Sequence, residues 1–166
     1  MLIESGRWQG KGTLLLAGNS LGVPVSGVLS VQREDGAYTV QGECAIDGQA
    51  ALPFSLRLHL NHEGLWTLAV YAQSLGMEGV AKLESEPHLA MLWDPESGRQ
   101  MSVTLFGVSG GVGCRGFLRR GDPVSPSTVT WEIAWRPEGV ATPPGTRGTA
   151  TARGGNVFSL RPFRKR

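Results

Sequence analysis

The chain has few of the residues that build disulfide-rich or zinc-stabilised domains, with only two cysteines among its 166 residues. Cys44 and Cys114 are too few, and too far apart in the sequence, for a disulfide framework or a zinc-binding motif. No apolar run approaches the roughly 18 residues of a membrane-spanning helix. The first residues include Glu4 and no long apolar stretch, so we expect no secretory signal, and by default a cytoplasmic location.

Charge is also sparse, and it is unevenly placed. Charged residues make up 18% of the chain, long runs of good helix formers are missing, and glycine is frequent, with 24 residues. The net charge is +2, but residues 137–166 carry six basic side chains and one acidic side chain. The rest of the chain is therefore net acidic, and the basic character belongs to the C-terminal segment.

The strongest positive signal is alternation of apolar and polar residues. About ten short segments between residues 6 and 136 alternate in this way, and turn-forming sequences such as EDG at 34–36 separate them. Alternation with period two is typical of strands that have one buried and one solvated face. Short connections between consecutive strands favour an up-and-down meander. The sequence therefore predicts an all-β protein built as an antiparallel meander of about ten strands.

Such a meander can hide its apolar face in a closed barrel or between two stacked sheets. We favour the barrel, which also removes the sheet edges. Glycine recurs on the predicted inner face, where it lets strands bend and is expected to leave space inside. These inward glycines are Gly10, Gly12, Gly27, Gly42, Gly79 and Gly116.

The alternation stops at the end of the predicted barrel domain, residues 1–136. Residues 137–166 are rich in Gly, Pro, Thr and Arg and are predicted to be a basic C-terminal extension. Such a segment is either a solvated tail or a contact for a protein or anionic partner. Nucleic acid is one anionic partner that its arginines would fit.

A group of glycines near residue 110 matches the spacing of a phosphate-binding motif. The sequence SGGVGCRG, residues 109–116, has the spacing G-x-G-x-x-G that binds phosphate at the start of a helix. No helical pattern follows it, so we expect no nucleotide site. We place Gly111 and Gly113 in a hairpin turn and Gly116 on the inner face of the next strand.

The sequence contains no clear pattern of metal ligands or catalytic residues. His59 and His62 with Glu63 are better explained as an outward strand position and a solvated turn than as a metal site. The predicted inner face offers few ionisable groups, which are Tyr38, Cys44, Arg99 and Cys114. We therefore expect no metal, no catalytic residues and no enzymatic activity.

The first predicted strand carries Gly6 and Trp8 as G-x-W, with a meander behind it. This pattern resembles the calycin group, which includes lipocalins, fatty-acid-binding proteins and nitrobindin-like barrels. The resemblance implies that Trp8 closes one end of the barrel and that a late basic residue, Arg120 or Arg136, packs over it. The chain departs from nitrobindin-like proteins because its last histidine is His88, so we expect no haem and no other cofactor.

The predicted interior is rich in aromatic residues and methionine. Ligand sites are mostly apolar, so this set predicts non-enzymatic binding of a small apolar or amphipathic molecule, with Arg99 placed to meet a ligand carboxylate. The alternative is a filled barrel that acts as a protein- or nucleic-acid-interaction module. The candidate ligand-binding residues are Trp8, Phe54, Trp66, Met91, Trp93, Arg99, Met101, Trp131 and Trp135.

Overall fold

A computed structural model of the chain describes residues 3–16, 21–73, 75–120 and 127–139. In these residues the chain forms ten strands and no helix, so no helix that could cross a membrane is found there. The strands are β1 (Gly6–Leu15), β2 (Val23–Glu34), β3 (Ala37–Ile46), β4 (Leu52–Leu60), β5 (Trp66–Ala72), β6 (Leu75–Lys82), β7 (His88–Asp94), β8 (Arg99–Val108), β9 (Gly111–Arg120) and β10 (Ser127–Pro137).

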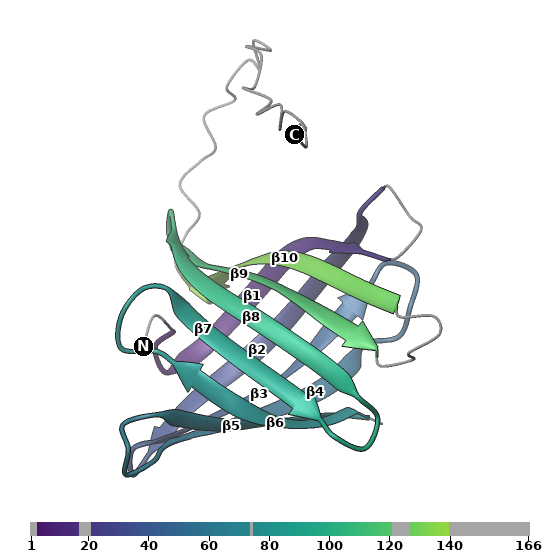
Figure 1. Cartoon of the computed structure of the whole chain (residues 1–166). Coiled ribbons are helices and arrows are strands. Elements are labelled where there is room, and N and C mark those ends of the chain that lie inside the picture. Colours follow the sequence, from purple (N-terminus) through teal and green to yellow (C-terminus); the bar gives the residue numbers. More distant parts are fainter. Residues whose placement is uncertain (1–2, 17–20, 74, 121–126, 140–166) are drawn as a thin grey trace, which may run out of the picture.

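The ten strands form one closed antiparallel barrel in simple up-and-down order (Figure 1). Each strand pairs with the next, and β1 pairs with β10 from Trp8 opposite Pro137 to Leu15 opposite Thr130. This last pairing removes both sheet edges. The predicted all-β meander barrel is confirmed. Most of the predicted extension, residues 140–166, lies outside the described residues.

The hairpin turns follow the local sequence. Asp35 and Gly36 both have positive φ, 48° and 80°, between the paired residues Glu34 and Ala37. Two consecutive residues with positive φ match the twist of the flanking strands, which is why Asp-Gly is favoured there.

The glycine motif at 109–116 was assigned only partly correctly. The turn is formed by Ser109 and Gly110, whereas Gly111 and Gly113 already belong to β9. Gly116 lies on the inner face, as predicted, under the Trp131 ring. No helix follows, so the spacing has no helix N-terminus with which to bind phosphate.

The inward glycines do not leave empty space, contrary to the prediction. A Cβ built on Gly10 would lie 2.6 Å from the Trp135 ring, and one on Gly116 would lie 2.3 Å from the Trp131 ring. A Cβ on Gly42 would lie 2.9 Å from the Phe54 ring. Aromatic rings therefore occupy the room over Gly10, Gly42 and Gly116, whereas a Cβ on Gly12 or Gly79 would lie 1.9 Å from a backbone oxygen of the neighbouring strand.

Strand β7 has the opposite orientation to the one predicted. Met91 and Trp93 were expected to point inward, but they are 55% and 46% exposed on the outer face. The inward residues of β7 are His88, Ala90 and Leu92. Both alternating sets are apolar enough to face a core, so the alternation does not decide between them.

Candidate functional site

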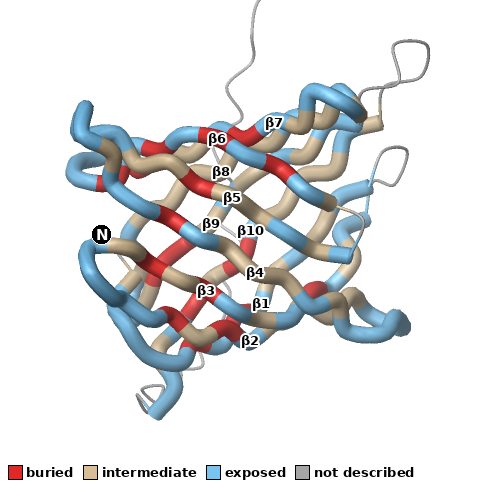
Figure 2. Tube along the Cα trace, turned by 90° about the horizontal axis from the view of Figure 1, so that it is seen from below, coloured by how far each residue is buried: buried red, intermediate tan, exposed pale blue. Residues whose placement is uncertain are grey.

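The two ends of the barrel differ in how well their inner faces are buried. The end that holds Gly6 of β1 is the closed half, and its buried inward side chains include Trp8, Val31, Tyr38, Leu68, Leu83 and Trp135. More of the buried segments lie toward the end of the barrel that holds the N-terminus (Figure 2), although Val25, Met77 and Leu92 are buried toward the other end. The apolar packing that excludes solvent is therefore densest in this half but is not confined to it.

The N-terminal segment contacts Trp8 and the core at this end. The Trp8 indole Nε1 donates a hydrogen bond to the Glu4 carbonyl oxygen at 3.0 Å, and Ile3 packs against the core. The Trp8 side chain is only 6% exposed, so its N–H needs this partner. Trp8 therefore lies near one end of the barrel, and the end-closing role implied by the resemblance stays a prediction.

The basic residues predicted to pack over Trp8 do not do so. Arg120 ends β9 opposite Ser127, at the other end of the barrel from Trp8. Arg136 pairs with Gln9, so its exposed side chain points to the outer face. Alternation along β1 and β10 places Gln9 and Arg136 on the face opposite to Trp8.

A different arginine lies at the closed end. The Arg33 guanidinium lies 5.4 Å from the centre of the Tyr38 ring, and Tyr38 contacts the Trp66 ring at 5.5 Å between centroids. The Trp66 indole donates to the Glu84 carboxylate, which lowers the pKa of Glu84. Sequence reasoning missed this cation–π contact because it looked for a basic residue late in the chain.

His88, at the start of β7, is a buried polar group on the inner face of the barrel. It is 8% exposed, and its Nδ1 lies 3.0 Å from the Leu83 carbonyl oxygen. This contact fixes the β6–β7 connection at the closed end. A buried imidazole with a backbone partner is a satisfied structural group.

The other end of the barrel is the open half. Several of its inward apolar side chains are partly exposed, and these are Leu52, Phe54, Val70, Met101, Leu118 and Trp131. Three others, Val25, Met77 and Leu92, are buried. The interior therefore has a more completely buried base and a half in which buried and partly exposed apolar side chains alternate around the wall.

The thiol of Cys114 lies between these two halves. Burial raises the pKa of the Cys114 thiol to about 11, although a hydrogen bond with Trp131 acts in the opposite direction. Burial also raises the pKa of Cys44, and the proximity of the Cys44 thiol contributes to the shift at Cys114. Both thiols are therefore protonated and poorly nucleophilic at neutral pH.

Arg99 lies at the rim of the open half, opposite Asp94. The pKa of Asp94 is lowered, first by the hydrogen bond from the Ser97 hydroxyl and also by the charge of Arg99. The guanidinium therefore already faces a carboxylate of its own chain, which weakens the case for Arg99 as the partner of a ligand carboxylate.

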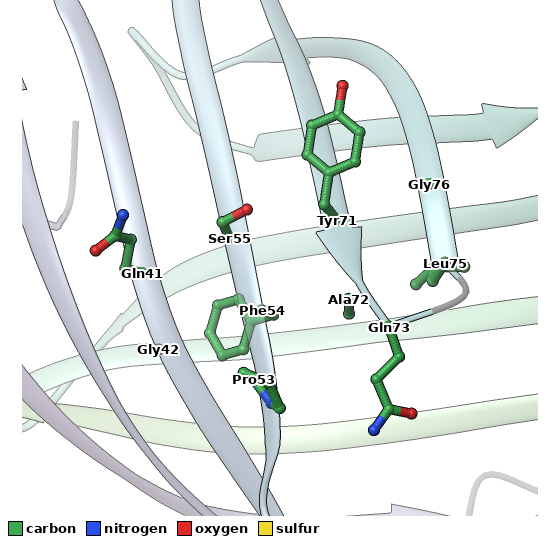
Figure 3. A pocket seen from close by; sticks show the side chains of 10 residues that line it. All are labelled: Gln41, Gly42, Pro53, Phe54, Ser55, Tyr71, Ala72, Gln73, Leu75 and Gly76. Atoms are coloured by element: carbon green, nitrogen blue, oxygen red, sulfur yellow. The ribbon is translucent and has the colours of Figure 1, made fainter.

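A pocket of about 620 Å³ opens at the rim of the open half, between β4 and the β5–β6 hairpin (Figure 3). We call it the rim notch. The β4–β5 ladder ends at Ser55 opposite Tyr71, although β4 begins three residues earlier at Leu52. The wall of the barrel is therefore unpaired beside the first residues of β4. The lining residues are Gln41, Gly42, Pro53, Phe54, Ser55, Tyr71, Ala72, Gln73, Leu75 and Gly76.

The candidate ligand residues thus fall into separate groups. Trp8, Trp66 and Trp135 belong to the closed half, whereas Phe54, Met101 and Trp131 belong to the open half. Arg99 lies at the rim, and Met91 and Trp93 lie outside the barrel.

Comparison with protein families and with curated proteins finds no relative of this chain. No family model matches the chain, and no curated protein gives a significant match to it.

Proposed function

We propose that the protein is a non-enzymatic binding protein for a small apolar or amphipathic molecule, held in the open half of a calycin-like barrel. The observation that carries this proposal is the difference between the two halves. Apolar side chains such as Phe54, Met101 and Trp131 face inward yet stay partly exposed, whereas most inward side chains of the closed half are buried. Partly exposed apolar groups in a concave site gain most from covering by an apolar ligand.

The inner face also supports a binding role rather than catalysis. Its ionisable groups in the described residues include two thiols with raised pKa and a histidine held by a backbone carbonyl. None of these groups is arranged as a nucleophile with a neighbouring base.

Quenching of tryptophan fluorescence by brominated acyl chains tests the proposal, because bromine quenches an indole that it contacts. The open half holds Trp131, and Trp93 on the outer face provides the matched control. We expect saturable quenching that is retained in Trp93→Phe and largely lost in Trp131→Phe. No quenching by any acyl chain, or loss of quenching in the Trp93 variant alone, contradicts the proposal.

A second candidate, a protein-interaction module, is supported by the outer face of β6–β9. Val80, Met91 and Phe117 lie in one row across these strands with Ser102, and Leu89 and Trp93 flank Met91 on β7. All five apolar side chains are 37% exposed or more. Apolar groups gathered on one exposed face often mark interaction sites.

Self-association is the direct measurement for this second candidate. Sedimentation of the full chain over a range of concentrations should show association that Met91→Ser with Trp93→Ser abolishes. A wild-type chain that stays monomeric removes a second copy of the chain as the partner. The basic extension, the other part of this alternative, lies outside the described residues.

A further inference from the structure

The rim notch passes from the outer face of the barrel wall to its inner face. On the outer face, Gln41, Ser55 and Tyr71 are directly opposite one another on β3, β4 and β5. On the inner face, Phe54, Ala72 and Leu75 line the same pocket. Figure 3 shows the two sets together, with the Phe54 ring turned toward Gly42. The notch is therefore polar outside and apolar inside.

The polar side of the notch carries hydrogen-bonding groups without charge. The row of Gln41, Ser55 and Tyr71 offers an amide, an aliphatic hydroxyl and a phenol, and Gln73 adds a second amide. Paired strands lie about 4.8 Å apart, so neighbouring members of the row can contact one polar group together. All ten lining residues are uncharged.

The charges beside the notch do not select an anion. Glu43 is opposite Pro53, and Arg57 follows Ser55 by two positions on the same face of β4. Glu78 follows Gly76 by two positions on the same face of β6, so two acidic groups and one basic group flank the notch, and none of the three lines the pocket. The other basic residue considered for the mouth, Arg99, faces Asp94. A charged ligand group would lose hydration in the notch without a charged partner to replace it.

We propose that the rim notch holds the uncharged, hydroxyl- or amide-bearing head group of an amphipathic ligand whose apolar chain lies in the open half. This inference rests on the proposed binding function and names its ligand class. The volume of about 620 Å³ is in the range of ligand sites, about 300–1,000 Å³. The Phe54 ring lies at the junction, where the head group ends and the chain begins.

The test compares four ligands that share one acyl or alkyl chain and differ only in the head group. They are a monoacylglycerol, a fatty acid, a fatty-acid methyl ester and an alkylamine, each measured by calorimetry with the full chain. We expect the monoacylglycerol to bind at least about tenfold more tightly than the methyl ester, since one or two hydrogen bonds contribute about 1.4 kcal/mol. The fatty acid and the alkylamine should show no such gain.

Variants then locate the head group. Gln41→Leu with Tyr71→Phe should reduce the affinity for the monoacylglycerol to that for the methyl ester, and leave the methyl ester unchanged. Both residues are exposed, so the fold should tolerate the changes. Gln32→Leu on the outer face of β2 is the matched control and should change nothing.

The outcomes separate the two proposals. Equal binding of all four ligands, tighter binding of a charged ligand, or an unchanged preference in the double variant overturns the inference and leaves the binding function standing. If none of the four ligands binds, both fail.

Discussion

Replacing Gly10 with alanine should destabilise the protein, although alanine is normally the better residue in a strand. The new Cβ would lie 2.6 Å from two ring atoms of Trp135, about 1 Å inside the usual carbon–carbon separation of about 3.5–4.0 Å. Trp135 is 5% exposed, and its ring also lies against Gly27 on β2, so the indole has little room to move. Gly10→Ala therefore forces the core to rearrange.

The expected size of the effect follows from two opposing terms. Overpacking of a core costs about 1–3 kcal/mol. Replacing a strand glycine by alanine contributes about 0.5–1 kcal/mol in favour of folding. The net loss in the free energy of unfolding therefore lies between about 0 and 2.5 kcal/mol, with a central value of about 1.3 kcal/mol. Urea denaturation followed by circular dichroism measures it, with a constant slope showing that the unfolding transition is unchanged.

Gly107→Ala is the matched control, because a Cβ at Gly107 has no atom within 4 Å. It should raise the free energy of unfolding by about 0.5–1 kcal/mol. In a Trp135→Leu background the indole is gone, so Gly10→Ala should become neutral or stabilising, with a coupling of at least about 1 kcal/mol. If Gly10→Ala and Gly107→Ala change stability alike in the wild-type background, the ring does not fill the space over Gly10.

Two other substitutions probe the closed half and the outer face by the same denaturation measurement. Trp8→Phe removes the indole N–H that bonds the carbonyl of the exposed residue Glu4, and should cost about 0.5–1.5 kcal/mol, the net contribution of one hydrogen bond. A change below about 0.5 kcal/mol would contradict a stabilising role for that bond. Met91→Ser and Trp93→Ser remove exposed side chains, so each should change stability by less than about 0.5–1 kcal/mol, whereas inward residues of this size would cost about 2–5 kcal/mol.

The strands of the barrel could be predicted from the sequence because the alternation of apolar and polar residues is a local property of each strand. The prediction of the inward face was wrong at β7, where Leu89, Met91 and Trp93 are as apolar as the set that begins with His88. The larger residues were predicted to be buried. The pairing with β6 decides which face of β7 points inward, because the inward residue Gly79 is opposite Leu92. Which face is inward there depends on pairing with another strand, which one strand's alternation does not encode.

The candidate site was less predictable than the fold. The open half exists because inward side chains at one end of the barrel are less covered, and that depends on the closure of ten strands together. The rim notch arises because the β4–β5 ladder stops at Ser55 while β4 starts at Leu52. Pro53 in the unpaired stretch, with no N–H to donate, was the one local signal for that gap.

The raised pKa of Cys114 predicts how stability changes at alkaline pH. The thiol has an ordinary value of 9.0 and a value of about 11 in the folded protein, mainly because of burial. Below pH 9.0 the Cys114 thiol is protonated in both the folded and the unfolded protein, so the stability that comes from burying the neutral thiol is fully present. As the pH rises further the unfolded chain loses its proton first, and the free energy of unfolding falls by about 1.4 kcal/mol per pH unit until the folded thiol also ionises.

The loss amounts to at most about 3 kcal/mol over that window, two pKa units in size. Other groups titrate in the same range, so the quantity to measure is the difference between the wild-type chain and Cys114→Val, which keeps an apolar side chain of similar size. The wild-type curve should fall more steeply than that of the variant between pH 9 and about 11, the interval set by the two pKa values. Parallel curves would show that water reaches the Cys114 thiol freely, and that the closed half does not extend as far along β9 as its burial indicates.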